Sequence, residues 1–133
     1  MEQPDTPAPP TDTDALNRQI AEMRGYTNFE TDEYGRHFAV NAIGERWVAP
    51  DYAGDPAAAL SLLEHVLTLD FEVTSICELH SRAVPWHVRL SRSWNHPAGT
   101  PINASACTLT EAIARACRDA LLVIKGDTDN GTA

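Results

Sequence analysis

The chain has 133 residues, a length typical of one domain, and its 43% hydrophobic content is enough for one core without metal or disulfide bonds. Its 19 acidic and 10 basic residues give a net charge of −9, which disfavours binding to duplex nucleic acid. No stretch of about 18 apolar residues occurs, so the sequence predicts no membrane association.

The N-terminal residues predict a disordered, acidic and proline-rich leader over 1–12. Residues 1–11 hold four of the nine prolines and no apolar run that a fold would bury. They also lack the basic residues of a secretory or transit peptide. We therefore expect one folded domain over 13–125, followed by a flexible tail over 126–133.

A first helix is predicted over 13–24, because Leu16, Ile20 and Met23 recur with helical spacing. Gly25 is typical of the residue that follows a helix end. The apolar stripe is narrow, so we expect this helix at the edge of the fold.

A short strand is predicted next over 36–42, where polar and apolar residues alternate. Trp47 and Val48 are expected to extend an irregular edge strand that stops before Pro50.

The second helix has the clearest start signals in the chain. Asp55 is a typical N-cap, and Pro56 fits the first helical position because that residue needs no N–H partner. The apolar residues that follow predict a broad buried face, which comprises Leu60, Leu62, Leu63, Val66 and Leu67.

Two strands with a period of two follow over 71–79 and 84–92, and their short link predicts an antiparallel hairpin. In the first strand the pattern places Phe71, Val73, Cys77 and Leu79 on one face and Glu72, Thr74, Glu78 and His80 on the other, with Ile76 as the exception. In the second it places Val84, Trp86, Val88 and Leu90 opposite His87, Arg89 and Ser91.

Residues 93–107 are rich in Asn, Pro, Gly and Ser and predict a loop. A third helix is predicted from Thr108, which forms a capping box with Glu111, and Gly126 is expected to close it. The predicted order is therefore α-β-α-β-β-α, an α+β sandwich with a small, mainly antiparallel sheet and flanking helices.

Four segments in this order carry a family resemblance: ALNRQIAEMRGY, WVAPDYAGDPAAALSLLEHV, WHVRLSR and TLTEAIARACRDALL. Together they resemble the phage ABA-sandwich domain family and, more distantly, small phage proteins of the NinX type. The resemblance spans about residues 13–124. It implies a phage or prophage accessory protein with helices on both faces of a sheet, located in the host cytoplasm, and it implies no catalytic residues. The alternation over 71–92 indicates instead that one face is open, thinly covered by the first helix, or covered by a partner subunit.

The stretch 79–110 contains no acidic residue and carries a formal charge of +3. Arginines beside aromatic and polar loop residues are typical of phosphate and nucleotide recognition. The candidate ligand-binding residues are Arg82, His87, Arg89, Arg92, Trp94 and Asn95. The alternative is that Arg89 pairs with Glu72 or Glu78 across the hairpin and that Arg82 and Arg92 are solvated.

Two aromatic residues flank the turn before the second helix. Trp47 and Tyr52 are candidates for an interface, and they suit the wall of a ligand cleft, core packing or a subunit contact.

No metal or cofactor site is predicted. The five histidines and three cysteines lack the spacing of a metal motif, and no phosphate-loop, dinucleotide or nucleophile motif occurs. Cys77, Cys107 and Cys117 are expected to be reduced thiols in a cytoplasmic protein.

The sequence favours a protein that acts by binding rather than catalysis. In the first version, the exposed sheet face and the Trp47/Tyr52 edge bind and modulate a host protein, as in counter-defence. In the second, the protein is a homo-oligomeric sponge for a small anionic nucleotide signal. A small hydrolase is the third alternative.

Overall fold

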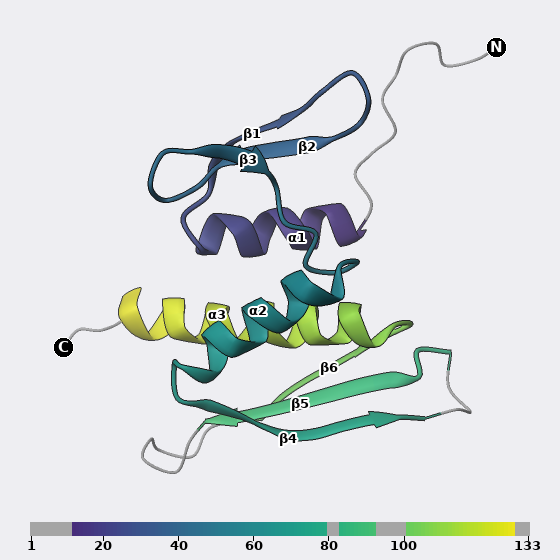
Figure 1. Cartoon of the computed structure of the whole chain (residues 1–133). Helices are drawn as coiled ribbons and strands as arrows, with labels where there is room; N and C mark the ends of the chain where they lie inside the picture. Colours follow the sequence, from purple (N-terminus) through teal and green to yellow (C-terminus); the bar gives the residue numbers. More distant parts are fainter. Residues whose placement is uncertain (1–11, 80–82, 93–100, 130–133) are drawn as a thin grey trace.

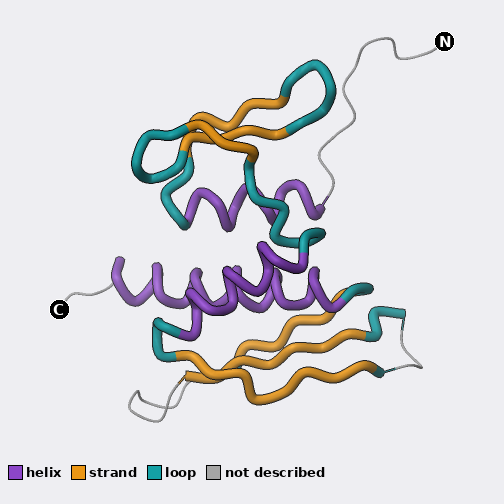
Figure 2. Tube along the Cα trace, in the orientation of Figure 1, coloured by secondary structure: helices purple, strands orange, loops and turns teal. Residues whose placement is uncertain are grey.

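The computed structural model describes residues 12–79, 83–92 and 101–129 (Figure 1). Within these residues, blocks of strands alternate with helices, and the structure has three helices and six strands there (Figure 2). They are α1 (Asp12–Met23), β1 (Thr27–Thr31), β2 (His37–Val40), β3 (Arg46–Val48), α2 (Pro56–Leu67), β4 (Phe71–Glu78), β5 (Trp86–Arg92), β6 (Ile102–Ala106) and α3 (Leu109–Asp129).

The strands form two antiparallel three-stranded sheets, in the orders β1-β2-β3 and β4-β5-β6. Figure 1 shows them at opposite ends of the molecule with the helices between them. The α1 helix lies beside the first sheet, and α2 and α3 cover one face of the second. The predicted α+β class with antiparallel strands and flanking helices is confirmed, but the strands are divided between two sheets.

Two strands were not predicted from the sequence. The β6 strand lies inside the expected loop over 93–107, and β1 lies between the first helix and the first expected strand. The β6 strand alternates buried and exposed residues, but its sequence INASA consists mostly of small and polar residues. Such residues have low strand propensity, so the alternation carries little apolar signal.

A β-bulge changes the expected pattern of faces in β4. The register with β5 shifts between Val73 and Ser75, so that Ile76 pairs with Val88 and Cys77 pairs with His87. Ile76 therefore shares a face with Val73, and Cys77 lies on the other face. The predicted placement of Cys77 and of Glu78 is wrong because the extra residue of a bulge reverses the alternation beyond it.

The α1 helix is part of the core rather than an edge element. Leu16 and Ile20 are fully buried, and the helix packs against α3. The predicted helix end is confirmed: Gly25 has a φ of +93°, and the amide of Tyr26 donates to the carbonyl of Ala21 at 3.0 Å. This arrangement is a Schellman motif.

The start of α2 is also confirmed, because the Asp55 carboxylate accepts a hydrogen bond from the Ala57 amide at 3.1 Å. The predicted buried face was too broad. Leu62 and Val66 are fully buried, whereas Leu60 and Leu67 are exposed.

The α3 helix starts as predicted but ends later. The Thr108 hydroxyl accepts from the Glu111 amide at 3.1 Å, which is one half of a capping box, while the Glu111 carboxylate pairs with Arg115 at 2.7 Å. The helix continues through Gly126, so the predicted tail over 126–133 is wrong for residues 126–129. Residues 1–11 and 130–133 lie outside the described residues.

Candidate functional site

The β4-β5-β6 sheet has one face toward the helices and one face without a helix over it (Figure 1). In the central strand β5, Val88 and Leu90 are fully buried against the helices, and His87 and Arg89 point to the opposite side. In the described part of the chain no other element covers that side, which we call the open face. The predicted alternation of β5 is therefore confirmed.

The pairing register brings polar residues into two rows across the open face. Cys77 on β4, His87 on β5 and Ser105 on β6 form one row. Ser75, Arg89 and Asn103 form the next row. Beyond these two rows the same face carries Glu72 beside Ser91, so in the described residues it combines one cation and one carboxylate with hydroxyl, amide, thiol and imidazole groups.

Both ring nitrogens of His87 have hydrogen-bond partners on β6. Nδ1 lies 3.0 Å from the Ser105 hydroxyl, and Nε2 lies 3.1 Å from the amide oxygen of Asn103. Because the Asn103 amide oxygen only accepts, Nε2 is the donor in that bond, and Nδ1 shares the other bond with the Ser105 hydroxyl. These bonds fix the orientation of the ring.

The Arg89 guanidinium is exposed at the centre of the open face. No carboxylate of the described residues lies within ion-pair distance of it. Glu72 pairs with Ser91 in the register, and Glu78 lies on the other face beside Trp86. The expected alternative, an ion pair of Arg89 with either glutamate, is therefore wrong.

Most other described arginines are paired with an acid. The pairs, with separations of 2.7 to 3.3 Å, are Arg18–Glu22, Arg36–Asp32, Arg46–Glu30, Arg115–Glu111 and Arg118–Asp119.

The structure does not bring the candidate arginines together. Arg92 lies on the helix-facing side of β5, where its guanidinium is 4.9 Å from the centre of the Phe71 ring. Arg82, Trp94 and Asn95 lie outside the described residues. Of the six predicted ligand-binding residues, the structure places His87 and Arg89 on the open face.

The two candidate interface residues have different environments. Trp47 on β3 is 59% exposed, and its indole N–H donates to Glu45 at 3.2 Å. Tyr52 is only 2% exposed and belongs to the core, which fits the core-packing alternative for this residue. Trp47 and the open face also lie at opposite ends of the molecule, and they do not form one surface (Figure 1).

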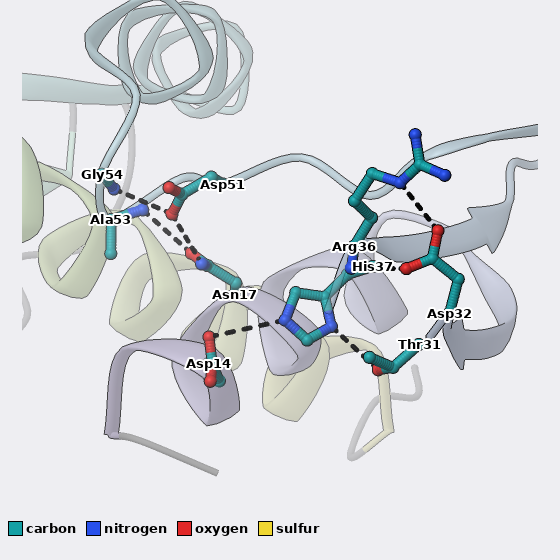
Figure 3. A network of polar contacts seen from close by, with 9 residues as sticks. All are labelled: Asp14, Asn17, Thr31, Asp32, Arg36, His37, Asp51, Ala53 and Gly54. Carbon is teal, nitrogen blue, oxygen red and sulfur yellow. Dashed lines mark hydrogen bonds and ion pairs between the residues drawn. The ribbon is translucent and has the colours of Figure 1, made fainter. Parts of the chain in front are cut away.

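A polar network joins α1 to the first sheet (Figure 3). His37 bridges the Thr31 hydroxyl at 3.0 Å and the Asp14 carboxylate at 4.0 Å. Asn17 donates to the Asp51 carboxylate at 2.8 Å and accepts from the Ala53 amide at 2.9 Å.

Burial acts to raise the pKa of Asp32, but hydrogen bonds from Arg36 and the Tyr34 amide outweigh it and hold that pKa below its ordinary value.

A groove of about 980 Å³ runs between α1 and this sheet. The arginines that line it, Arg18 and Arg36, are both neutralised by carboxylates, so the groove offers no free cation to an anionic ligand.

The open face contains the residue types of a nucleophile, a base and an orienting group in Ser105, His87 and Asn103. Hydrolysis also needs donors for the developing oxyanion and a pocket for the substrate. The N–H groups of β5 are used in the ladders on both sides, and the groove along α1 does not reach His87. The arrangement is therefore better suited to binding than to acyl transfer.

The described residues offer no other obvious chemistry. None of their His, Cys, Asp and Glu side chains gather in a group of three or more that could hold a metal ion. Among the helices described, none has the length and apolar character needed to cross a membrane. Burial raises the pKa of the Cys117 thiol to about 12, so it is unreactive in the folded protein.

Asn103 and Ser105 contribute to the open face but were not among the predicted site residues. The signal that could have found them is the alternation in residues 102–106, which places both on one side of a strand.

No family model, curated protein or solved structure matches this chain. The resemblance to the phage ABA-sandwich family therefore stays a prediction.

Proposed function

We propose that this protein acts by binding another protein through the open face of the β4-β5-β6 sheet, with Arg89 at the centre of the contact. The observation that carries the proposal is an exposed guanidinium in the central strand without a carboxylate partner among the described residues. An unpaired arginine surrounded by hydrogen-bonding groups is a frequent anchor of protein interfaces.

The shape of the open face favours a macromolecular partner. Small ligands are usually held in concave sites, whereas this surface is one side of a three-stranded sheet. The groove along α1 lies elsewhere, and its lining includes none of the residues of the open face. A protein partner can cover both polar rows at once.

The charge distribution indicates the chemistry of the partner. Among the described residues the open face carries the Arg89 cation and, at one end, the Glu72 carboxylate, in a protein of net charge −9. The partner is expected to present a carboxylate to Arg89 and neutral hydrogen-bonding groups to His87, Asn103 and Ser105. Charge complementarity of this kind speeds association and selects the partner.

The setting that we propose is a phage or prophage accessory protein that modulates a host protein in the host cytoplasm. Its support is the sequence resemblance. A sponge for a nucleotide signal has less support, because Arg89 and Arg92 lie on opposite faces of the sheet and do not converge on one phosphate group.

Capture from host lysate with two charge-reversed baits tests the proposal. Arg89→Glu is the test bait, and Lys125→Glu on α3 is the control because it changes the net charge equally at an exposed site. The true partner should be retained by wild type and by the control and be depleted at least about tenfold on Arg89→Glu. Equal capture by both variants, or no protein enriched on wild type, would overturn the proposal.

A further inference from the structure

A cleft of about 480 Å³ lies where the end of α1, the β2–β3 turn and α2 meet. Its lining has polar groups from Arg24, Tyr26, Asn41, Tyr52 and Ser61. The rest of the wall is apolar and comes from Ala42, Ile43, Pro50 and Ala58. A concave site of this size, with convergent polar groups beside an apolar wall, is typical of small-molecule sites.

Arg24 is the cation of the cleft, and the local backbone fixes its position. It is the last residue before Gly25, and its amide donates to the carbonyl of Ile20 at 3.0 Å. In the described part of the protein no carboxylate lies within ion-pair distance of Arg24. The Arg24 guanidinium acts on the nearby Tyr52 hydroxyl, whose pKa it lowers against the effect of burial, and its five N–H groups can serve more than one acceptor.

The titration of neighbouring groups supports the position of this charge. Burial raises the pKa of Tyr52, and the Arg24 cation opposes that rise. Burial lowers the pKa of His65, and the Arg24 cation lowers it further. The Arg24 charge therefore acts on Tyr52 in the cleft lining and on His65, and no described carboxylate lies within ion-pair distance of it.

We propose that this cleft binds a small organic carboxylate, whose head group pairs with Arg24 and whose apolar body lies against Ala42, Ile43 and Pro50. A guanidinium binds a carboxylate with two parallel hydrogen bonds. The cleft has one cation and no second arginine in its lining, which suits a monoanion better than a phosphate dianion. The site lies between α1, the first sheet and α2, and it is separate from the open face.

Three probes separate the contributions of the head group and the body. Benzoate has both, acetate has only the anion, and benzyl alcohol has only the apolar body. Binding is followed by two-dimensional NMR of the full chain, using the amides of Asn41, Ala42 and Ser61. We expect saturable shifts with benzoate at a Kd of about 1–10 mM and at least tenfold weaker binding of acetate and benzyl alcohol.

The His65 ring gives an independent readout. A carboxylate bound to Arg24 offsets the charge that disfavours imidazolium, so benzoate should raise the pKa of His65. Benzyl alcohol should leave it unchanged. If benzoate binds elsewhere on the protein, the His65 titration will not move, and the proposal is overturned.

Two variants and one control complete the test. Arg24→Gln removes the cation, and Ala58→Leu fills the cleft and keeps Arg24, so each should weaken benzoate binding at least tenfold. Arg18→Gln removes one positive charge from α1, outside the cleft lining, and should bind within twofold of wild type. Unchanged binding in Ala58→Leu, or in a folded Arg24→Gln, overturns the proposal, as does binding of benzyl alcohol as tight as that of benzoate.

Discussion

Two leucines of α2 that the sequence does not distinguish have opposite environments, and the same substitution at both tests the packing. Leu62 is 0% exposed and Leu60 is 53% exposed. A change to alanine removes three carbon groups, which at about 0.8 kcal/mol each costs about 2.4 kcal/mol at the fully buried site. The unfilled cavity adds about 1–2 kcal/mol, so Leu62→Ala should lower the free energy of unfolding by about 3.4–4.4 kcal/mol.

Leu60→Ala loses less than half of the transfer free energy and leaves no enclosed cavity, so we expect a loss of about 1 kcal/mol. Urea unfolding followed by circular dichroism measures both values, and equal m-values show that the comparison is valid. Both variants lie in one helix and share the same change in helix propensity, so each controls for the other. An equal loss at the two positions would refute the packing of α2.

Further predictions concern the backbone, the thiols and a histidine. Gly25→Ala should destabilise the protein more than Gly44→Ala. Both glycines have a positive φ near +90°, so the backbone strain of an alanine is similar at the two positions. The new methyl group at position 25 would lie 3.2 Å from the Cβ of Ala42, whereas the space at position 44 is open. A thiol reagent should label exposed Cys107 in the folded protein and buried Cys117 only after unfolding, as mass spectrometry will show. The pKa of His65 is lower in the folded protein, so the unfolded chain binds a proton at this ring more readily. The free energy of unfolding should therefore fall as the pH drops below 6.5, the ordinary pKa of histidine. This fall should be smaller in a His65→Gln variant.

Sequence reasoning succeeds in this chain where one local signal decides the structure. Asp55 and Pro56 start a helix whatever their surroundings, and Gly25 ends one because it accepts a positive φ at no cost. The same reasoning fails where the cause is tertiary. Thr74 gives no sign that a bulge occurs there, since the bulge is defined by the pairing of two strands.

The candidate site shows the same limit. The period-two pattern of β5 correctly separates His87 and Arg89 from the buried residues. Their partners Asn103 and Ser105 were missed because the alternation in β6 is short and rests on small residues, so it is a weak strand signal until the pairing with β5 is known. The cleft at Arg24 joins three segments far apart in the sequence, so no spacing rule could reveal it.

The most direct test of the proposed function is the affinity of the captured partner for three forms of the protein, measured by titration calorimetry at physiological salt. A central arginine that loses its role in an interface typically costs 2 kcal/mol or more, so Arg89→Glu should raise the Kd by at least about thirtyfold. Lys125→Glu should stay within about threefold of wild type. Equal affinities for all three forms would contradict the claim that the open face is the binding surface.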